Sequence, residues 1–110
     1  MTPPTKLPSM TIPERDTVLA VLRANRGRLV ATYGIKDLQL FGSVVRGEAT
    51  EASDIDLVVE FDPDRISLSS FLDFSDDLEA LLGRRVDVVS LKKLAPRLRA
   101  QVEAEAIRVA

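Results

Sequence analysis

The sequence predicts an α/β domain of the α+β kind, with a small mixed β-sheet flanked by helices. Two short runs rich in apolar and β-branched residues, 55–61 and 86–90, are typical of buried strands. Apolar residues at 68, 71, 72, 78, 81 and 82 recur at helical spacing, which favours an amphipathic helix over 67–82 between those strands, with Phe74 partly outside its apolar stripe. Helical and extended segments alternate along the rest of the chain, and its 110 residues suit one domain with a single modest core.

A proline-rich tail and a first helical region are expected at the N-terminus. Residues 1–12 are poor in apolar side chains, so we expect a flexible tail there and a domain over 13–110. Pro13 suits the first position of a helix, where a missing N–H costs nothing. Asn25 favours a break or bend in this helical region, and Gly34 favours its end.

The later elements follow from apolar spacing and from the turn residues between them. Gly42 ends one apolar run, Gly83 ends another, and Pro96 suits the start of a final helix. The expected elements are a strand over 38–41, a helical turn over 43–46, a strand over 55–61, a helix over 67–82, a strand over 86–90 and a helix over 96–109.

The composition excludes several kinds of chemistry. The chain has neither cysteine nor histidine, which eliminates disulfides, Ser-His-Asp and Cys-His catalysis, and ordinary zinc sites. No apolar stretch approaches the roughly 18 residues that span a membrane, and no signal-peptide pattern follows the start, so we expect a cytoplasmic protein with no membrane contact. A net charge of −2 argues against direct binding of nucleic acid over a broad surface. An enzyme of this composition would rely on carboxylates and a metal.

Two aspartates one residue apart, Asp54 and Asp56, lead into the second expected strand. Because strand side chains alternate between faces, both carboxylates project the same way while Ile55 and Leu57 face the core. Two like charges about 6–7 Å apart repel by roughly 2–3 kcal/mol at an effective dielectric of about 20. A Mg²⁺ ion would turn that cost into binding energy, because it prefers carboxylate oxygens and keeps positions open for phosphates.

A third carboxylate, Asp87, interrupts the valine-rich third strand. A buried unpaired carboxylate costs several kcal/mol, so we expect Asp87 either at the strand end in water or beside a cation. If the third strand lies next to the second, Asp87 joins Asp54 and Asp56 at one edge of the sheet. Three such carboxylates would hold one or two Mg²⁺ ions, an arrangement that serves phosphoryl and nucleotidyl transfer.

The Gly42-Ser43 turn is a candidate phosphate site. Gly42 lets the backbone approach a ligand closely because no Cβ intervenes, and Ser43 can cap the helical turn that follows. The amides of Ser43 and Val44 would lie at the start of that turn, where partial positive charge favours a phosphate. Arg46 would reach either a phosphate oxygen or an acidic side chain that braces the loop, and the sequence leaves both open.

These motifs together resemble a known signature. Gly42-Ser43, ten further residues, and then Asp54-x-Asp56 resemble the pattern of the DNA polymerase β-like nucleotidyltransferase superfamily. The string FGSVVRGEATEASDIDLVV, with the later GRRVDVVSL, is similar to the minimal nucleotidyltransferases, whose MntA-type members are antitoxin partners of HEPN-domain toxins. The similarity covers about residues 14–109, and spacing, flanking strands and the third aspartate all agree.

The resemblance implies an ATP-dependent enzyme of a type VII toxin–antitoxin system. Such an enzyme uses Mg²⁺, with two ions expected, to transfer AMP to a tyrosine hydroxyl of its HEPN ribonuclease toxin, with which it forms a hetero-oligomer. The implied catalytic residues and metal ligands are Asp54, Asp56 and Asp87, the last also as base for the attacking hydroxyl. The implied nucleotide-binding residues are Gly42, Ser43 and Arg46.

Two other functions stay open at this point. A non-catalytic antitoxin would neutralise its toxin by binding and occlusion, with a vestigial metal site. A small-molecule nucleotidyltransferase, for example one that modifies an antibiotic, would work as an oligomer. After the third strand only one helix is expected, which leaves no second domain for a tRNA or an aminoglycoside and so favours a protein acceptor.

Overall fold

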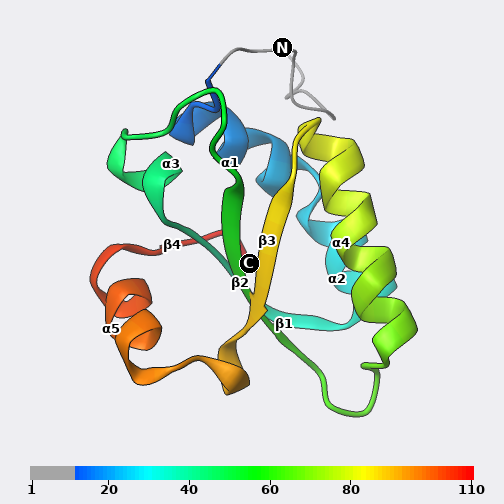
Figure 1. Ribbon diagram of the computed structural model, residues 1–110. Coiled ribbons are helices and arrows are strands. Elements are labelled where there is room, and N and C mark those ends of the chain that lie inside the picture. The colour runs from blue at the N-terminus through cyan, green and yellow to red at the C-terminus, as the bar shows by residue number, and fades with distance from the viewer. Residues whose placement is uncertain (1–11) are drawn as a thin grey trace.

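The protein folds as a four-stranded mixed sheet with helices on both faces, as the computed structural model shows for residues 12–110 (Figure 1). The strand order is β3-β2-β1-β4. Strands β2 and β3 are parallel, whereas β1 pairs antiparallel with both β2 and β4. The predicted α/β class with a small mixed sheet is therefore confirmed. The expected tail lies outside the described residues, except for Ile12.

The described elements follow one another in the predicted alternation, with one strand added at the C-terminal end. The helices are α1 (Arg15–Ala24), α2 (Arg26–Tyr33), α3 (Ser43–Arg46), α4 (Leu68–Leu82), a 3₁₀ turn (Leu91–Lys93) and α5 (Pro96–Glu105). The strands are β1 (Ile35–Phe41), β2 (Ile55–Phe61), β3 (Val86–Ser90) and β4 (Ile107–Arg108). None of the helices described is long and apolar enough to cross a membrane.

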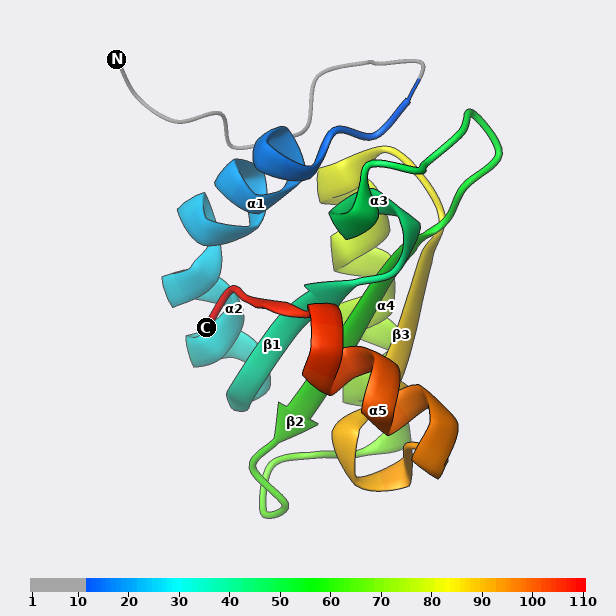
Figure 2. The same ribbon diagram turned by 90° about the vertical axis from the view of Figure 1, so that its left-hand side faces the viewer.

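Two apolar clusters hold the helices on the sheet. Helices α1, α2 and α4 cover one face, and α5 covers part of the other, as the two perpendicular views show (Figures 1 and 2). The larger cluster contains Ile55 and Leu57 of β2, both fully buried, as their alternation with the aspartates predicts. The smaller cluster joins Phe41 and Val58 to Val102 of α5. The aspartate at position 56 therefore lies on the same face as α5.

The N-terminal helical region breaks where the sequence predicts but begins later than expected. Two helices meet at Asn25, and Gly34 ends the second in a left-handed conformation with φ of 68°. Pro13 is not the first helical residue, and that expectation is wrong. Glu14 caps α1 instead, with extended dihedral angles, and its carbonyl accepts the Val18 N–H at 2.9 Å.

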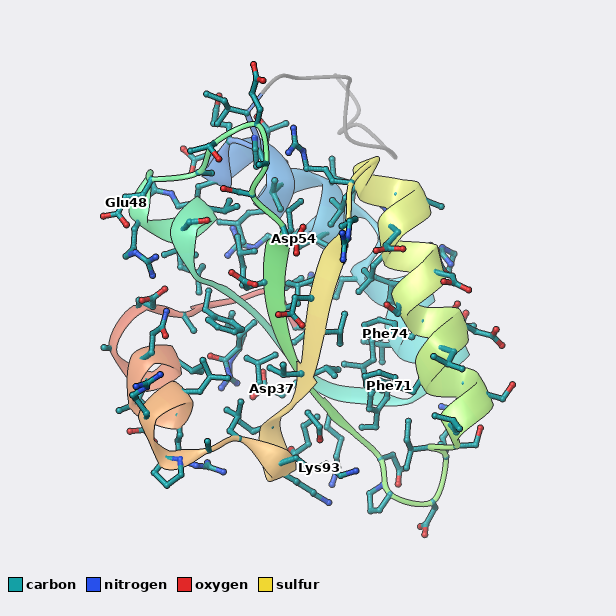
Figure 3. The ribbon with its side chains drawn as sticks, in the orientation of Figure 1. Asp37, Glu48, Asp54, Phe71, Phe74 and Lys93 are labelled. Atoms are coloured by element: carbon teal, nitrogen blue, oxygen red, sulfur yellow. The ribbon has the colours of Figure 1, made fainter. Side chains whose placement is uncertain are left out.

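Helix α4 buries a different stripe from the one expected at its start. Phe74, expected partly outside the apolar stripe, is fully buried and packs edge-on against Tyr33 and Phe61, with ring centroids 5.2 and 5.4 Å away. Figure 3 shows Phe71 and Phe74 between α4 and the sheet. Leu68 and Leu72 are instead 76% and 53% exposed. The aromatic residues fill the space next to the sheet, and this sets the rotation of the helix.

The C-terminal segment corrects the sequence prediction. The final helix ends at Glu105 rather than near Val109, because Ala106 has extended dihedral angles and the next residues form β4. The open edge of β1 offers backbone partners there: the Val109 N–H donates to the Leu38 carbonyl at 2.7 Å. Val109 is buried in the larger core cluster. Helix α5 is thereby fixed beside the end of β1.

Candidate active site

The candidate site lies where the carboxyl end of β1 meets the amino ends of β2 and β3. The register pairs Asp56 with Phe41 of β1 on one side and with Asp87 of β3 on the other. Registered residues of neighbouring strands project to the same face, so the carboxylates of Asp56 and Asp87 lie side by side on the α5 face of the sheet. The expected adjacency of the second and third strands is confirmed.

Asp54 lies just before β2 and is exposed to solvent. Figure 3 shows it near the ends of β2 and β3. The preceding loop is held by a Thr50 N–H that donates to the Ser53 hydroxyl at 2.8 Å. Arg84 donates to the carbonyls of Glu51 and Ser53, at 3.2 and 3.4 Å. Arg84 therefore braces the loop that leads to Asp54.

Gly42 is the point of closest packing against the catalytic candidates. Its backbone has φ of 85° and ψ of −157°, a conformation that L side chains rarely adopt. A Cβ placed there would lie 2.2 Å from Oδ2 of Asp56. Glycine is thus required twice, once for the backbone conformation and once for the space that the Asp56 carboxylate occupies.

The predicted helical turn is present as α3, although its cap differs from the prediction. Gly42 is the capping residue, and Ser43 is the first helical residue without a side-chain capping bond. The Ser43 hydroxyl is half-buried and is not used to cap the turn. It stays available for another partner.

Arg46 pairs with two acidic side chains, of which one comes from the far end of the chain. Its Nε donates to Glu48 at 2.8 Å, and its Nη1 donates to both carboxylate oxygens of Glu105 at 3.0 Å. Glu105 also accepts the backbone N–H of Gly42 at 2.5 Å. Of the two roles left open for Arg46, the bracing contact is the one present here, and nucleotide binding stays a prediction.

The environment of Asp56 disfavours its charged form. Burial is the largest cause, followed by the nearby charges of Asp87 and Asp54, and together they raise the pKa of Asp56 to about 6. Arg46 opposes this shift and lowers the pKa, whereas Glu105 adds to it. The three aspartates therefore lie close enough to interact electrostatically.

A divalent cation fits this carboxylate set by its chemistry. Hard carboxylate oxygens are the ligands that Mg²⁺ prefers, and a cation would relieve the repulsion that raises the pKa of Asp56. Within residues 12–110, however, no three acidic side chains form a ready-made metal cage. The fit therefore rests on donor type and mutual charge, and the predicted roles of Asp54, Asp56 and Asp87 as ligands stay predictions.

A cavity of about 470 Å³ borders the other side of α3. It is formed by the start of α1 and the segment after Ser43, and Arg46 contributes to its wall. None of the three aspartates lines it. The three carboxylates therefore lie outside this cavity.

Two residues of this region were missed by sequence reasoning. Glu105 contacts Gly42 and Arg46 across 63 and 59 positions of the chain. It lies within the helix expected over 96–109, and the observed helix ends at this residue. Arg84 contacts the loop before Asp54 across 33 and 31 positions. No local pattern in the sequence signals either contact.

Comparison with known proteins agrees with this geometry. A family described as the nucleotidyltransferase domain matches residues 22–109. The protein adenylyltransferase MntA of Thermococcus cleftensis is 37% identical over 94 residues, which cover 86% of this chain and 94% of that protein.

Solved structures show the same likeness. A structure described as a minimal nucleotidyltransferase is 49% identical, with a TM-score of 0.66 over 81% of this chain and 93% of the other. The complex of a tri-AMPylated HEPN toxin with its MNT antitoxin from Shewanella oneidensis matches with a TM-score of 0.60 and 21% identity, over 84% of this chain and 71% of the other. This last likeness concerns the fold alone.

The family match over residues 22–109 includes the four strands, the Gly42 turn, and Asp56 and Asp87, which pair in register. The sequence identity to relatives of nearly the same length supports the same family. The chain belongs to the nucleotidyltransferase domain family, as a minimal nucleotidyltransferase, and is a nucleotidyltransferase enzyme.

Proposed function

We propose that this protein is a Mg²⁺- and ATP-dependent adenylyltransferase that acts as an antitoxin, by transferring AMP to a hydroxyl group of a HEPN-domain ribonuclease toxin. The observation that carries the proposal is the packing of the Gly42 turn against Asp56, beside Asp87 in register. A phosphate-binding turn next to paired carboxylates is what nucleotidyl transfer requires. The T. cleftensis relative, named a protein adenylyltransferase, supports the choice of AMP and of a protein acceptor.

The proposed roles divide between the two sides of the site. Asp54, Asp56 and Asp87 would hold the metal, and the turn at Gly42 and Ser43 would bind the triphosphate. Bound Mg²⁺ would neutralise phosphate charge and stabilise the leaving oxygen. The half-buried Ser43 hydroxyl, which caps nothing, suits a hydrogen bond to a phosphate oxygen.

The reaction is an in-line substitution at the α-phosphorus of ATP. The acceptor oxygen forms a new bond to that phosphorus, the bond between phosphorus and the α–β bridging oxygen breaks, and pyrophosphate leaves. Asp87 would accept the hydroxyl proton, because it is the exposed carboxylate on the edge strand, where a second protein can reach it. Catalysis would come chiefly from positioning and from charge neutralisation.

The proposed acceptor is a tyrosine hydroxyl of the toxin. The description of the S. oneidensis complex, a tri-AMPylated HEPN toxin with an MNT antitoxin, supports a HEPN protein as partner. The exposure of Asp54 and of Asp87 on the edge strand supports a macromolecular acceptor, since an exposed strand edge admits a protein surface.

The test is transfer of labelled adenylate to a HEPN-domain protein from the same organism. The purified chain is mixed with that protein, Mg²⁺ and ATP labelled at the α-phosphate, and the acceptor is mapped by mass spectrometry. We expect AMP on a tyrosine of the partner, no transfer with EDTA, and none with the Asp56→Asn variant.

Two results would separate the alternatives. If the triple Asp→Asn variant at positions 54, 56 and 87 still protects cells from the toxin, the protein acts by occlusion and the proposal is wrong. Adenylate found only on an added aminoglycoside, with the partner unmodified, would indicate a small-molecule enzyme instead.

A further inference from the structure

The carboxylate of Glu105 joins the end of α5 to the turn of the active site. It accepts the Gly42 N–H at 2.5 Å and receives Nη1 of Arg46 on both oxygens at 3.0 Å. Its side chain is 17% exposed, and its bond to the Gly42 N–H is partly buried, whereas its contacts with Arg46 lie at the surface. Hydrogen bonds to an ionised carboxylate are roughly twice as strong as neutral ones, and they gain strength where water is excluded.

These contacts fix the part of the backbone whose position matters most. Gly42 lies between β1 and α3, and its Cα carbon faces Oδ2 of Asp56 closely enough to exclude a Cβ. A small shift of the Gly42 backbone would therefore change both the shape of the turn and the space left for the Asp56 carboxylate. The Gly42 N–H is the donor through which Glu105 holds this backbone in place.

The position of Glu105 is itself fixed. Helix α5 ends at this residue, and β4 begins two residues later, paired with β1. The Val109 N–H bond to the Leu38 carbonyl anchors the segment that follows. Val102, one turn earlier in α5, is buried against Phe41, the residue that precedes Gly42. Glu105 is thus held by the packing of Val102 before it and by the pairing of β4 with β1 after it.

We propose that Glu105 is a positioning residue for nucleotide binding: it acts through the Gly42 amide and Arg46 and does not touch the nucleotide. This rests on the proposed function, since it assumes that the Gly42 turn binds the triphosphate. Glu105 sets the turn in its binding conformation and keeps Arg46 beside it. The negative charge of Glu105 pairs with Arg46, and one of its carboxylate oxygens accepts the Gly42 N–H.

The two contacts can be separated by substitution. Glu105→Gln keeps an acceptor for the Gly42 N–H but loses the charge that pairs with Arg46, whereas Glu105→Ala loses both. We expect the KM for ATP to rise about 10-fold in Glu105→Gln. We expect kcat/KM for ATP to fall about 100-fold in Glu105→Ala, because a misplaced binding turn loses orientation. The KM for the protein acceptor should not change in either variant.

The matched control is Glu103→Gln, an exposed glutamate of the same helix that should behave as the wild type. A double-mutant cycle of Glu105→Gln with Arg46→Gln should be non-additive, since each change removes the same pair. Equal KM values for ATP in Glu105→Gln, Glu105→Ala and Glu103→Gln would overturn the proposal.

A second readout does not depend on activity. In the wild type without nucleotide, the amide proton of Gly42 should resonate downfield because of its short bond to a carboxylate, and it should move upfield in Glu105→Ala but not in Glu103→Gln. Binding of Mg²⁺ with a non-hydrolysable ATP analogue should weaken in the same order. If the wild type binds the analogue but transfers no AMP, the proposed function fails while these two readouts still decide the role of Glu105. An unchanged Gly42 resonance in Glu105→Ala would contradict that role.

Discussion

Asp56 and Asp87 occupy the same register position on neighbouring strands, yet their surroundings differ sharply. Asp56 is half-buried on an inner strand, against Gly42, and its pKa is raised to about 6 by burial and by the nearby aspartates. Asp87 is exposed on the edge strand, and within the described part of the chain no hydrogen bond or ion pair holds its carboxylate.

The two strands contribute to the site in different ways. On the inner side, Asp56 and the Gly42 turn are held by packing and by the Glu105 contacts. Burial there disfavours the charged form of Asp56, which costs free energy. On the edge side Asp87 is exposed, which would suit the proposed metal, nucleotide and acceptor. A fixed position and an exposed position are thus separated onto two adjacent strands.

The largest expected effect comes from removing the inner carboxylate. Asp56→Asn keeps the shape of the side chain but removes a charge that the proposed metal needs, so AMP transfer should fall at least about 1,000-fold, or about 4 kcal/mol in activation free energy. The fold should persist, because the variant relieves charge repulsion. Radiolabel transfer and circular dichroism measure the two outcomes, with Asp64→Asn, at the opposite end of β2, as control. Unchanged transfer by Asp56→Asn would exclude a catalytic role for this carboxylate.

The edge carboxylate should show a smaller and different effect. If Asp87 accepts the hydroxyl proton, Asp87→Asn lowers kcat about 100-fold, within the usual range for a general base. Because Asp87 is exposed, its replacement should leave the thermal midpoint within about 2 °C, which corresponds to a surface-sized change of less than about 0.5 kcal/mol. Single-turnover kinetics separates this loss from nucleotide binding. A destabilised Asp87→Asn protein would show that the two sides do not differ as described.

The glycine at the junction should affect the inner side alone. Gly42→Ala forces a Cβ into the space of the Asp56 carboxylate at an unfavourable φ, which costs about 1–3 kcal/mol of stability and about 10-fold or more of activity. Gly47→Ala is the matched control: its φ is 72°, but no atom lies within 4 Å of the added Cβ. Denaturant unfolding and the transfer assay should show loss of stability in both variants and a large loss of activity only at Gly42.

The sequence predicted the parts of this site that local patterns encode. Alternation placed Ile55 and Leu57 in the core and Asp56 on the other face, and helical spacing located α4 and its end at Gly83. The sequence predicts that Asp87 lies near Asp54 and Asp56 only if the third strand pairs with the second. The parallel pairing of β2 and β3 meets this condition.

What the sequence did not predict depends on contacts between distant segments. Strand β4 has two residues and forms because β1 offers an open edge. So short a strand has no pattern of its own, and the helical spacing of the preceding residues predicts a helix there instead. Glu105, the last residue of α5, contacts Gly42 across 63 positions of the chain. The burial of Phe74 instead of Leu68 follows from ring packing against Tyr33 and Phe61, which spacing along one helix cannot reveal.

The smallest expected effect is a pH dependence of stability that separates the inner side from the edge. The pKa of Asp56 is raised from 3.8 to about 6 in the folded state, so between those values the native protein binds more protons than the unfolded chain. The free energy of unfolding should therefore fall as the pH rises from about 4 to about 6, and it should stay lowered above that. With allowance for solvent screening, we expect a contribution of about 1–2 kcal/mol.

Comparison of variants isolates this contribution from the other titrating groups. Urea unfolding between pH 4 and pH 8 should show Asp56→Asn gaining stability relative to the wild type as the pH rises. Mg²⁺ should stabilise the wild type more at pH 8 than at pH 5, because the ion requires the deprotonated carboxylate, and it should have little effect on Asp56→Asn. If the free energies of unfolding of the wild type and of Asp56→Asn change in parallel with pH, charging of Asp56 does not destabilise the folded protein. Asp56 and Asp87 would then differ only in their exposure to solvent.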